Sequence, residues 1–148
     1  MEKITKEELK TILEQHKLWL DSDGEKGKRA DLSSADLTCV DLTGADLRLA
    51  NLRHTNLSDA DLTHANLTNA YLIYANLTGA NLSCADLTYA DLTHANLSDA
   101  NLTWAYLTEA NLSDANLTGV NLIHTNLIGA ILTGAIIDKK RHIADSKN

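Results

Sequence analysis

Leucine recurs at every fifth position from Leu32 to Leu132, and Ile137 continues the series. Written in five-residue units, residues 30–139 form twenty-two repeats, with Leu at the centre of twenty-one. The residue two positions before the centre is Ala in eighteen units, and the residue between them is Asn in eleven and Asp in seven. The residue after the centre is Ser or Thr in sixteen units. Apolar and polar positions therefore follow one fixed order in every unit.

A period of five residues fits neither a helix nor a continuous strand. On a helix the leucines would spread around the whole surface, and on a strand every second leucine would point to the opposite face. The chain must therefore turn once per unit. Because Ala and Leu are two residues apart, they share a face in extended geometry and are predicted to point inward. Asn or Asp between them is predicted to point outward, and the Ser/Thr position to begin a corner.

One turn per unit closes the chain into a coil, and successive coils can stack through backbone hydrogen bonds as neighbouring strands do. Outward residues recur after eight units, as in the pairs His54/His94, Asp59/Asp99 and Gly79/Gly119. Such a shift makes two coils of four units, but no whole number of three-unit or five-unit coils. The pattern predicts an all-β solenoid of about five and a half coils over residues 30–139.

The repeated motif resembles that of the pentapeptide-repeat family, which is a small residue, Asp or Asn, Leu, Ser or Thr, and a free position. It is matched over residues 30–137. The resemblance implies a right-handed quadrilateral β-helix with four units per coil and with the central and small residues inward. Most members of that family have no assigned biochemical activity, and some protect a type II topoisomerase by presenting an acidic rod of duplex-like width.

Residues 1–29 depart from the repeat and predict an α-helical cap followed by a turn. Thr5 to Glu8 match a capping box, Ile4 and Leu9 are placed as a hydrophobic staple, and the helix is expected to end near Asp21. An apolar stripe on this helix could cover the first Leu layer of the solenoid. The stripe consists of Leu9, Ile12, Leu13, His16 and Leu20, with Trp19 beside it. A membrane-surface helix would need a basic polar face, whereas this one is balanced.

The outward positions become apolar where the repeats stop. Isoleucine replaces the usual polar residue at Ile123, Ile128, Ile131 and Ile136. Either the polar C-terminal tail, residues 140–148, folds back over these side chains, or another molecule covers them. The tail has Ile143 as its one strongly apolar residue, so it offers too little apolar surface to cover the end of the solenoid. The pattern therefore favours a homodimer through the C-terminal coil.

Charge is distributed unevenly along the chain. Residues 30–137 hold eleven acidic and two basic side chains, a net charge of −9, within a formal charge of −7 for the whole chain. Since phosphate neutralisation requires Lys and Arg, this body argues against direct nucleic-acid binding. The apolar runs are too short for a membrane span or a signal peptide, and Cys39 and Cys84 lack a partner motif. We therefore expect a cytoplasmic protein with free thiols, no membrane association and no cofactor.

A few side chains stand out as candidate partner contacts. Arg48 and Arg53 are the two basic residues of the repeat body, and they flank Leu49. With four units per coil, every twentieth residue falls in one column, which aligns His54, Tyr74 and His94. These six residues are the candidate contacts: Arg48, Leu49, Arg53, His54, Tyr74 and His94. Successive coils are about 4.8 Å apart, and His54 and His94 are two coils apart. They are therefore too far from each other to bind one metal ion, and no metal site is expected.

Catalytic signatures are not recognisable in the sequence, which has no Ser/His/Asp order, phosphate-binding loop or paired buried carboxylates. We therefore expect a non-enzymatic protein-binding or scaffold module that offers rigid flat faces to a protein partner of unknown identity. The alternative is a DNA-mimicking inhibitor or protector of a type II topoisomerase. The acidic body favours this alternative, whereas the shortness of the rod and the lack of Phe at the central positions disfavour it.

Overall fold

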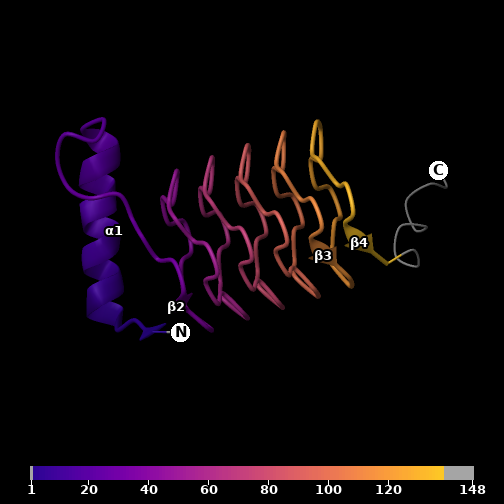
Figure 1. Ribbon diagram of the computed structural model, residues 1–148, viewed down its shortest axis with the longest axis horizontal. Helices are drawn as coiled ribbons and strands as arrows, with labels where there is room; N and C mark the ends of the chain where they lie inside the picture. The colour runs from indigo at the N-terminus through magenta and orange to yellow at the C-terminus, as the bar shows by residue number, and fades with distance from the viewer. Residues whose placement is uncertain (1, 139–148) are drawn as a thin grey trace.

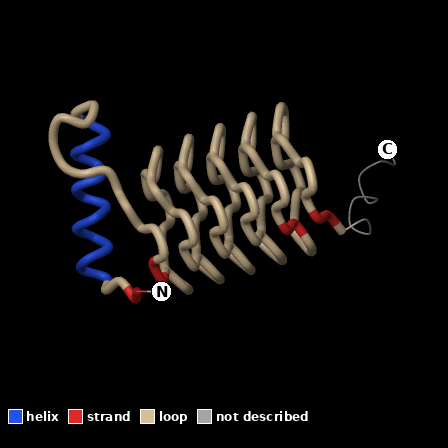
Figure 2. The backbone as a smooth tube through the Cα atoms, in the orientation of Figure 1, coloured by secondary structure: helices blue, strands red, loops and turns tan. Residues whose placement is uncertain are grey.

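The chain forms a stack of coils with one helix across its N-terminal end (Figure 1). The computed structural model describes residues 2–138, so Lys139 and the predicted tail, 140–148, lie outside the described residues. Its regular elements are β1 (Glu2–Lys3), α1 (Lys6–Asp21), β2 (Ala35–Asp36), β3 (Asn116–Leu117) and β4 (Ile136–Ile137). Figure 2 shows the coils almost entirely as loop, because each straight side is too short to count as a strand.

Successive coils are joined by parallel backbone pairing with a constant offset. Asp31 pairs with Asn51, Asn51 with Tyr71 and Tyr71 with Asp91, so each partner lies four units further along the chain. On another side of the stack, the Leu82 N–H donates to the Asn101 carbonyl at 2.8 Å, and the Asn101 N–H donates to the Ala80 carbonyl at 2.9 Å. The prediction of four units per coil is therefore confirmed.

The core is a column of Leu and Ala side chains that runs through the stack. The exposed fraction is 0% for every central Leu from Leu47 to Leu112, and the Ala two positions before the centre is buried in nearly all of these coils. The predicted inside of the solenoid is therefore confirmed. Thr55, which replaces Ala in its unit, is also buried, and its hydroxyl donates to the Leu32 carbonyl at 2.7 Å.

The turn predicted for each unit is a tight four-residue turn, and its backbone conformation was not predicted from the sequence. The Ala60 N–H donates to the Leu57 carbonyl at 3.1 Å, which closes a four-residue turn. The residue before Ala60 is Asp59, and its φ of 56° lies in the left-handed region. A positive φ at the third turn position is the mark of a type II turn, which favours Gly and Asn. Tyr74 and Trp104 adopt the same backbone at φ 58° and 61°, so the turn also imposes this conformation on bulky residues.

The Asn and Asp side chains are half-buried rather than simply outward, and they brace the turns. The Asn76 side-chain oxygen accepts from the Thr78 N–H at 3.2 Å and from the Thr78 hydroxyl at 2.6 Å. Its amide nitrogen donates to the Asn56 side-chain oxygen at 3.0 Å. Asn96 instead donates to the Thr78 hydroxyl at 2.9 Å. The expected amide ladder thus exists in part, interleaved with hydroxyl acceptors.

Acidic side chains at the turns face glycines one coil further along. A Cβ added to Gly79 would collide with the carboxylate of Asp59, and one added to Gly119 would collide with that of Asp99. Two further pairs are Glu109 with Gly129 and Asp114 with Gly134. In each pair the glycine leaves room for the carboxylate, because a larger residue would have to displace it.

Helix α1 caps the N-terminal end largely as the sequence predicted. Thr5 is the N-cap residue, and Thr5 and Glu8 form the capping box. Leu9 and His16 are buried, while Ile12 and Leu13 pack against the core. Strand β1, which the sequence did not indicate, pairs in parallel with β2 and extends the ladder beyond the first coil.

His16 attaches α1 to the first repeat unit. Its exposed fraction is 0%, its Nδ1 accepts from the Ala30 N–H at 3.1 Å, and its ring stacks on Trp19 at 5.9 Å. Among the described residues, no group bonds its buried Nε2. Burial lowers the pKa of His16; the charges of Arg29 and Arg48 act in the same direction, and the Arg48 backbone and Asp46 oppose it. The histidine is therefore neutral in the folded protein at neutral pH.

Leu82→Ala should destabilise the protein by about 2 to 5 kcal/mol, because a close-packed Leu layer cannot collapse around the void. Thr88→Ala, at a half-buried corner of a unit nearby, should cost much less. Denaturant unfolding of both variants measures the two losses. Equal losses would contradict the assignment of inside and outside.

Acidification should loosen the cap through His16. Because the folded-state pKa of His16 is lowered, the unfolded chain binds the proton more readily. The contribution of neutral His16 to the free energy of unfolding is fully present above the unfolded pKa of about 6.5. It is lost as the pH falls through that value toward the folded pKa, by at most about 1.4 kcal/mol per pH unit. His16→Gln does not titrate and can still accept from Ala30, so its unfolding free energy should vary less between neutral and mildly acidic pH. Parallel pH profiles for the native chain and this variant would refute the assignment.

Candidate partner-binding surface

Four of the six predicted contact residues lie on one side of the stack. Arg53 and His54 belong to the unit 50–54, Tyr74 to 70–74 and His94 to 90–94, and these units follow one another in the parallel ladder. Side chains at equivalent positions are therefore superposed along the rod. We call His54, Tyr74 and His94 the aromatic column.

The rings of the aromatic column are stacked on one another. The His54 and Tyr74 centroids are 5.1 Å apart with planes inclined by 7°, and those of Tyr74 and His94 are 4.7 Å apart with planes inclined by 10°. The His94 Nε2 lies 3.9 Å from the Asp114 carboxylate, one coil further. The three residues share a left-handed backbone near φ 58°, which explains why the rings project in the same direction. Tyr74 is 53% exposed, so this ordered stack presents its ring edges to solvent.

A second cluster on the same side was missed by the sequence reasoning. The guanidinium carbons of Arg29 and Arg53 lie 5.1 Å and 4.3 Å from the centroid of the Tyr71 ring. The Arg29 Nε–H donates to the Leu49 carbonyl at 2.7 Å, and an Arg53 terminal nitrogen donates to the Asn51 side-chain oxygen at 3.1 Å. The available signal was Tyr71 itself, because it replaces the usual Asn or Asp of its unit.

Arg48 and Leu49 belong to the preceding unit, 45–49, and hence to the neighbouring side of the stack. Arg48 makes two hydrogen bonds to the Asp46 carboxylate, at 2.8 Å and 2.7 Å. These bonds lower the pKa of Asp46, and the carboxylate in turn raises the pKa of Arg48. Leu49 is 37% exposed. Arg48 is thus engaged within its own unit, which makes it a weaker contact candidate than Arg53.

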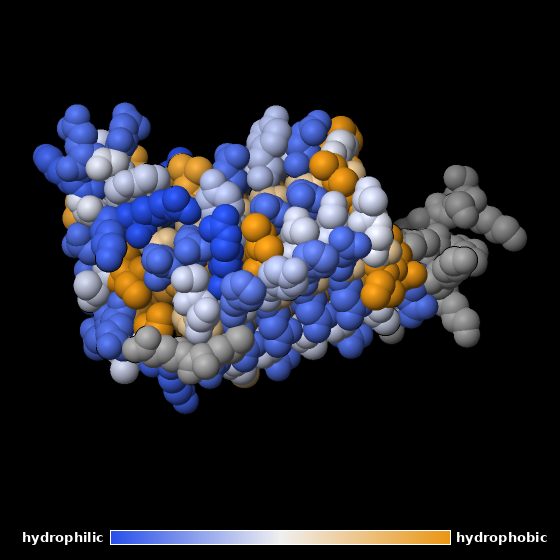
Figure 3. Space-filling model, viewed as in Figure 1, coloured by the Kyte–Doolittle hydropathy of each residue, from blue (hydrophilic) through white to orange (hydrophobic). Residues whose placement is uncertain are grey.

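The visible face of the molecule is largely hydrophilic, with apolar groups gathered toward its two ends (Figure 3). At the C-terminal end the four predicted isoleucines are exposed: Ile123 by 49%, Ile128 by 72%, Ile131 by 49% and Ile136 by 60%. They belong to four consecutive units, one on each side of the final coil. The outward placement of these residues is therefore confirmed.

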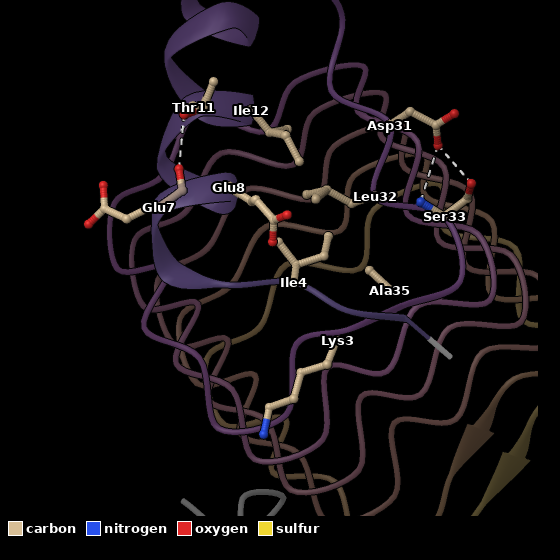
Figure 4. A pocket seen from close by; sticks show the side chains of 10 residues that line it. All are labelled: Lys3, Ile4, Glu7, Glu8, Thr11, Ile12, Asp31, Leu32, Ser33 and Ala35. Carbon is tan, nitrogen blue, oxygen red and sulfur yellow. Dashed lines mark hydrogen bonds between the residues drawn. The ribbon is translucent and has the colours of Figure 1, made fainter.

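The N-terminal end contains clefts between α1 and the first coil. One has a volume of about 540 Å³, and in the close view Ile4, Ile12 and Leu32 form an apolar centre with charged groups at its edge (Figure 4). The Glu8 carboxylate accepts from the Thr5 N–H at 2.8 Å and the Thr5 hydroxyl at 2.7 Å. These bonds lower the pKa of Glu8, so the carboxylate is fixed in its charged form for helix capping.

Within residues 2–138, no three His, Cys, Asp or Glu side chains are placed to hold a metal ion together. Helix α1 is also not long and apolar enough to cross a membrane.

The family model for pentapeptide repeats matches this chain in eight copies over residues 28–63, 60–99 and 95–134. The chain belongs to the pentapeptide-repeat family. Members of this family form right-handed quadrilateral β-helices, in agreement with the four-unit coils of this pentapeptide-repeat protein. No curated protein matches the chain.

Several solved structures resemble this pentapeptide-repeat protein. Rfr23 from the cyanobacterium Cyanothece 51142 is 37% identical over 77% of this chain and 68% of its own, with a TM-score of 0.36. HetL from Nostoc sp. strain PCC 7120, involved in heterocyst differentiation regulation, is 35% identical over 74% of this chain and 64% of its own, with a TM-score of 0.34. The chain thus spans slightly less than two thirds of HetL. A trypsin-treated form of QnrB1, a plasmid-mediated fluoroquinolone resistance protein, is 19% identical over 76% of this chain and 83% of its own, with a TM-score of 0.32.

Proposed function

We propose that this protein is a non-enzymatic, cytoplasmic protein-binding module, built on a right-handed β-helix of about five and a half coils. Its partner contacts the side that carries the aromatic column, Arg53 and Tyr71. The observation that carries the proposal is the stacking of His54, Tyr74 and His94 in a solvent-exposed row. Exposed, aligned aromatic rings have no role in the Leu and Ala core, which is complete without them.

The physical properties of this side suit protein recognition. Tyr and Arg are enriched at protein interfaces, since they combine a large contact area with polar groups. A side chain that is already held in place loses little conformational entropy on binding. Here each ring of the column is held by its neighbours, and Arg53 is held by Asn51 and Tyr71. The surface is therefore preorganised for a partner.

A second candidate function is protection of a type II topoisomerase by an acidic, DNA-like surface. The observation in its favour is that hydrogen bonds from the residue two positions further on lower the pKa of five Asp side chains. These are Asp31, Asp36, Asp41, Asp46 and Asp61. They stay charged at neutral pH and maintain the acidic body. The basic and aromatic side chains on the Tyr74 side favour the first proposal.

A photo-crosslinking amino acid in place of Tyr74 should capture a specific protein from a lysate of the cells that make this chain. Tyr89 provides the matched control position, because it is also a tyrosine at the end of a unit and is 59% exposed, but its unit belongs to another side of the stack. Mass spectrometry identifies the captured proteins.

Capture of the same proteins at both positions would contradict the proposed surface. A type II topoisomerase among the proteins captured would favour the second function instead.

The C-terminal coil is proposed to form a homodimer with a second copy. The final Leu layers open to solvent around a cavity of about 190 Å³ that is lined only by aliphatic side chains. The lining residues are Leu102, Leu107, Leu112, Leu117, Leu122, Leu127, Leu132 and Ile137. A two-fold contact would cover this opening and the four exposed isoleucines on both chains, and it would leave the helical caps outward, so that assembly stops at two.

Ile128→Asp combined with Ile136→Asp should convert a dimer into a monomer. Each Ile that is buried in the contact contributes about 1.5 to 3 kcal/mol to the free energy of association. The contributions of the four isoleucines of both chains together exceed the entropic cost of forming a weak or moderate dimer. Light scattering over a wide concentration range measures the mass, with Thr108→Asp, one coil before Ile128, as the control. A native chain that stays monomeric at every concentration would refute the dimer.

A further inference from the structure

Arg29 and Arg53 bring two guanidinium groups to the same tyrosine. Arg29 comes from the segment that leads from α1 into the first coil, and Arg53 comes from the coil before that of Tyr71. Their guanidinium carbons are 5.1 Å and 4.3 Å from the ring centroid, so they cannot be further from each other than the sum of these distances. Both side chains are half-buried, which limits their freedom to move apart.

Neither of these arginines forms an ion pair with another described residue, in contrast to Arg48 and Asp46. The two acidic residues in the same ladder as Tyr71, which are Asp31 and Asp91, are already hydrogen-bonded. Asp31 accepts from the Ser33 N–H at 3.1 Å, from the Ser33 hydroxyl at 2.7 Å and from the Asn51 amide at 2.9 Å. Asp91 accepts from the Thr93 N–H at 3.1 Å. Two like charges are thus held against one tyrosine ring. The charge of Arg29 helps to lower the pKa of Asp31, but among the described residues no carboxylate pairs directly with either arginine.

Each guanidinium retains donors beyond the bond that positions it. Arg29 uses its Nε for the Leu49 carbonyl, and Arg53 uses one terminal nitrogen for Asn51. A guanidinium has five N–H donors arranged as a fork that matches the two oxygens of a carboxylate. The positioning bonds therefore orient the two forks and leave the remaining N–H groups for a ligand.

We propose that Arg29 and Arg53 form a clamp for a carboxylate side chain of the protein partner. This inference rests on the proposed function, since the clamp lies beside the aromatic column on the same side of the stack. The partner is expected to place a Glu or Asp between the two guanidinium groups and an aromatic or aliphatic side chain against Tyr74. Local charge complementarity then adds specificity to the aromatic contact.

The surrounding charge distinguishes a protein ligand from a nucleic acid. A duplex carries closely spaced phosphates over its whole length, and affinity for it grows with the number of phosphates that are neutralised. The repeat body has eleven acidic side chains against two basic ones, so a long polyanion would meet repulsion beyond the clamp. A single carboxylate on an otherwise neutral segment meets only the two arginines.

The test is a nuclear magnetic resonance titration of the whole chain, in which the Nε–H signals of the arginines are followed. The probe is the peptide Gly-Tyr-Glu-Glu-Tyr-Gly, and its control is the same peptide with both Glu replaced by Gln. Arg53→Gln removes one half of the clamp, and Arg48→Gln removes the same charge from the neighbouring side. Arg29 is left unchanged, because its bond to Leu49 also attaches the linker to the coils.

We expect the Glu peptide to shift the Arg29 and Arg53 signals saturably and to leave that of Arg48 unchanged. Loss of a charge-assisted bidentate contact should weaken binding about tenfold, both for the Gln peptide and for Arg53→Gln, with little effect of Arg48→Gln. Equal affinity for the two peptides, equal effects of the two Arg variants, or no saturable shift would overturn the clamp. Tighter binding of a short DNA duplex through the same arginines would also overturn it, in favour of a nucleic-acid ligand.

The outcome separates this inference from the proposed function. If cross-linking through position 74 succeeds and the titration fails, the partner binds the aromatic column without a carboxylate in the clamp. If the titration succeeds and no protein is captured, the carboxylate site stands and the assignment of its use is wrong.

Discussion

The parallel backbone ladder between coils is the constraint on which the rest of this structure depends. Each main-chain N–H and C=O that faces along the rod needs a partner in the adjacent coil, because unpaired backbone groups in the stack would be costly. This requirement fixes the offset at four units all the way from Asp31 to Ile131. Once the offset is fixed, every side chain has a defined neighbour above and below. The Leu core, the Asn and Thr network and the stacked rings all follow from that one register.

The sequence predicted the features that follow from the period of the repeat. It did not predict those that depend on backbone conformation at the turns or on contacts between residues far apart in the chain. The period of Leu32 to Leu132 indicated the inside of the solenoid, and the capping box at Thr5 indicated the start of α1. The left-handed turn residue was not foreseen, because position five of the unit accepts residues as different as Gly79 and Trp104. The contact of Arg29 with Tyr71 was not foreseen either, since it joins residues far apart in the chain across the boundary between linker and coil.

The three outer regions of the rod have different physical character. The N-terminal end is closed by α1 and by the bond between His16 and Ala30, whereas the last described coil exposes aliphatic side chains on every side. Between them the polar sides carry exposed aromatic residues in two places: the side with His54, Tyr71 and Tyr74, and the sides with Tyr89, Trp104 and Tyr106. A rigid rod separates these regions at fixed distances, so pairing of the C-terminal ends would hold two partner-binding surfaces in one fixed relative geometry.

The pairing of turn carboxylates with glycines sets the step by which such a rod can be lengthened or shortened. Along one corner the order is Asp59, Gly79, Asp99 and Gly119, an alternation with a period of two coils. Removing a single coil, for example residues 60–79, would bring Asp59 opposite Asp99 and set one carboxylate against another. Removing or inserting two whole coils restores the alternation. The unit that can be copied without conflict at this corner is therefore the double coil, in agreement with the recurrence of Asp59 as Asp99 and of Gly79 as Gly119 after eight units.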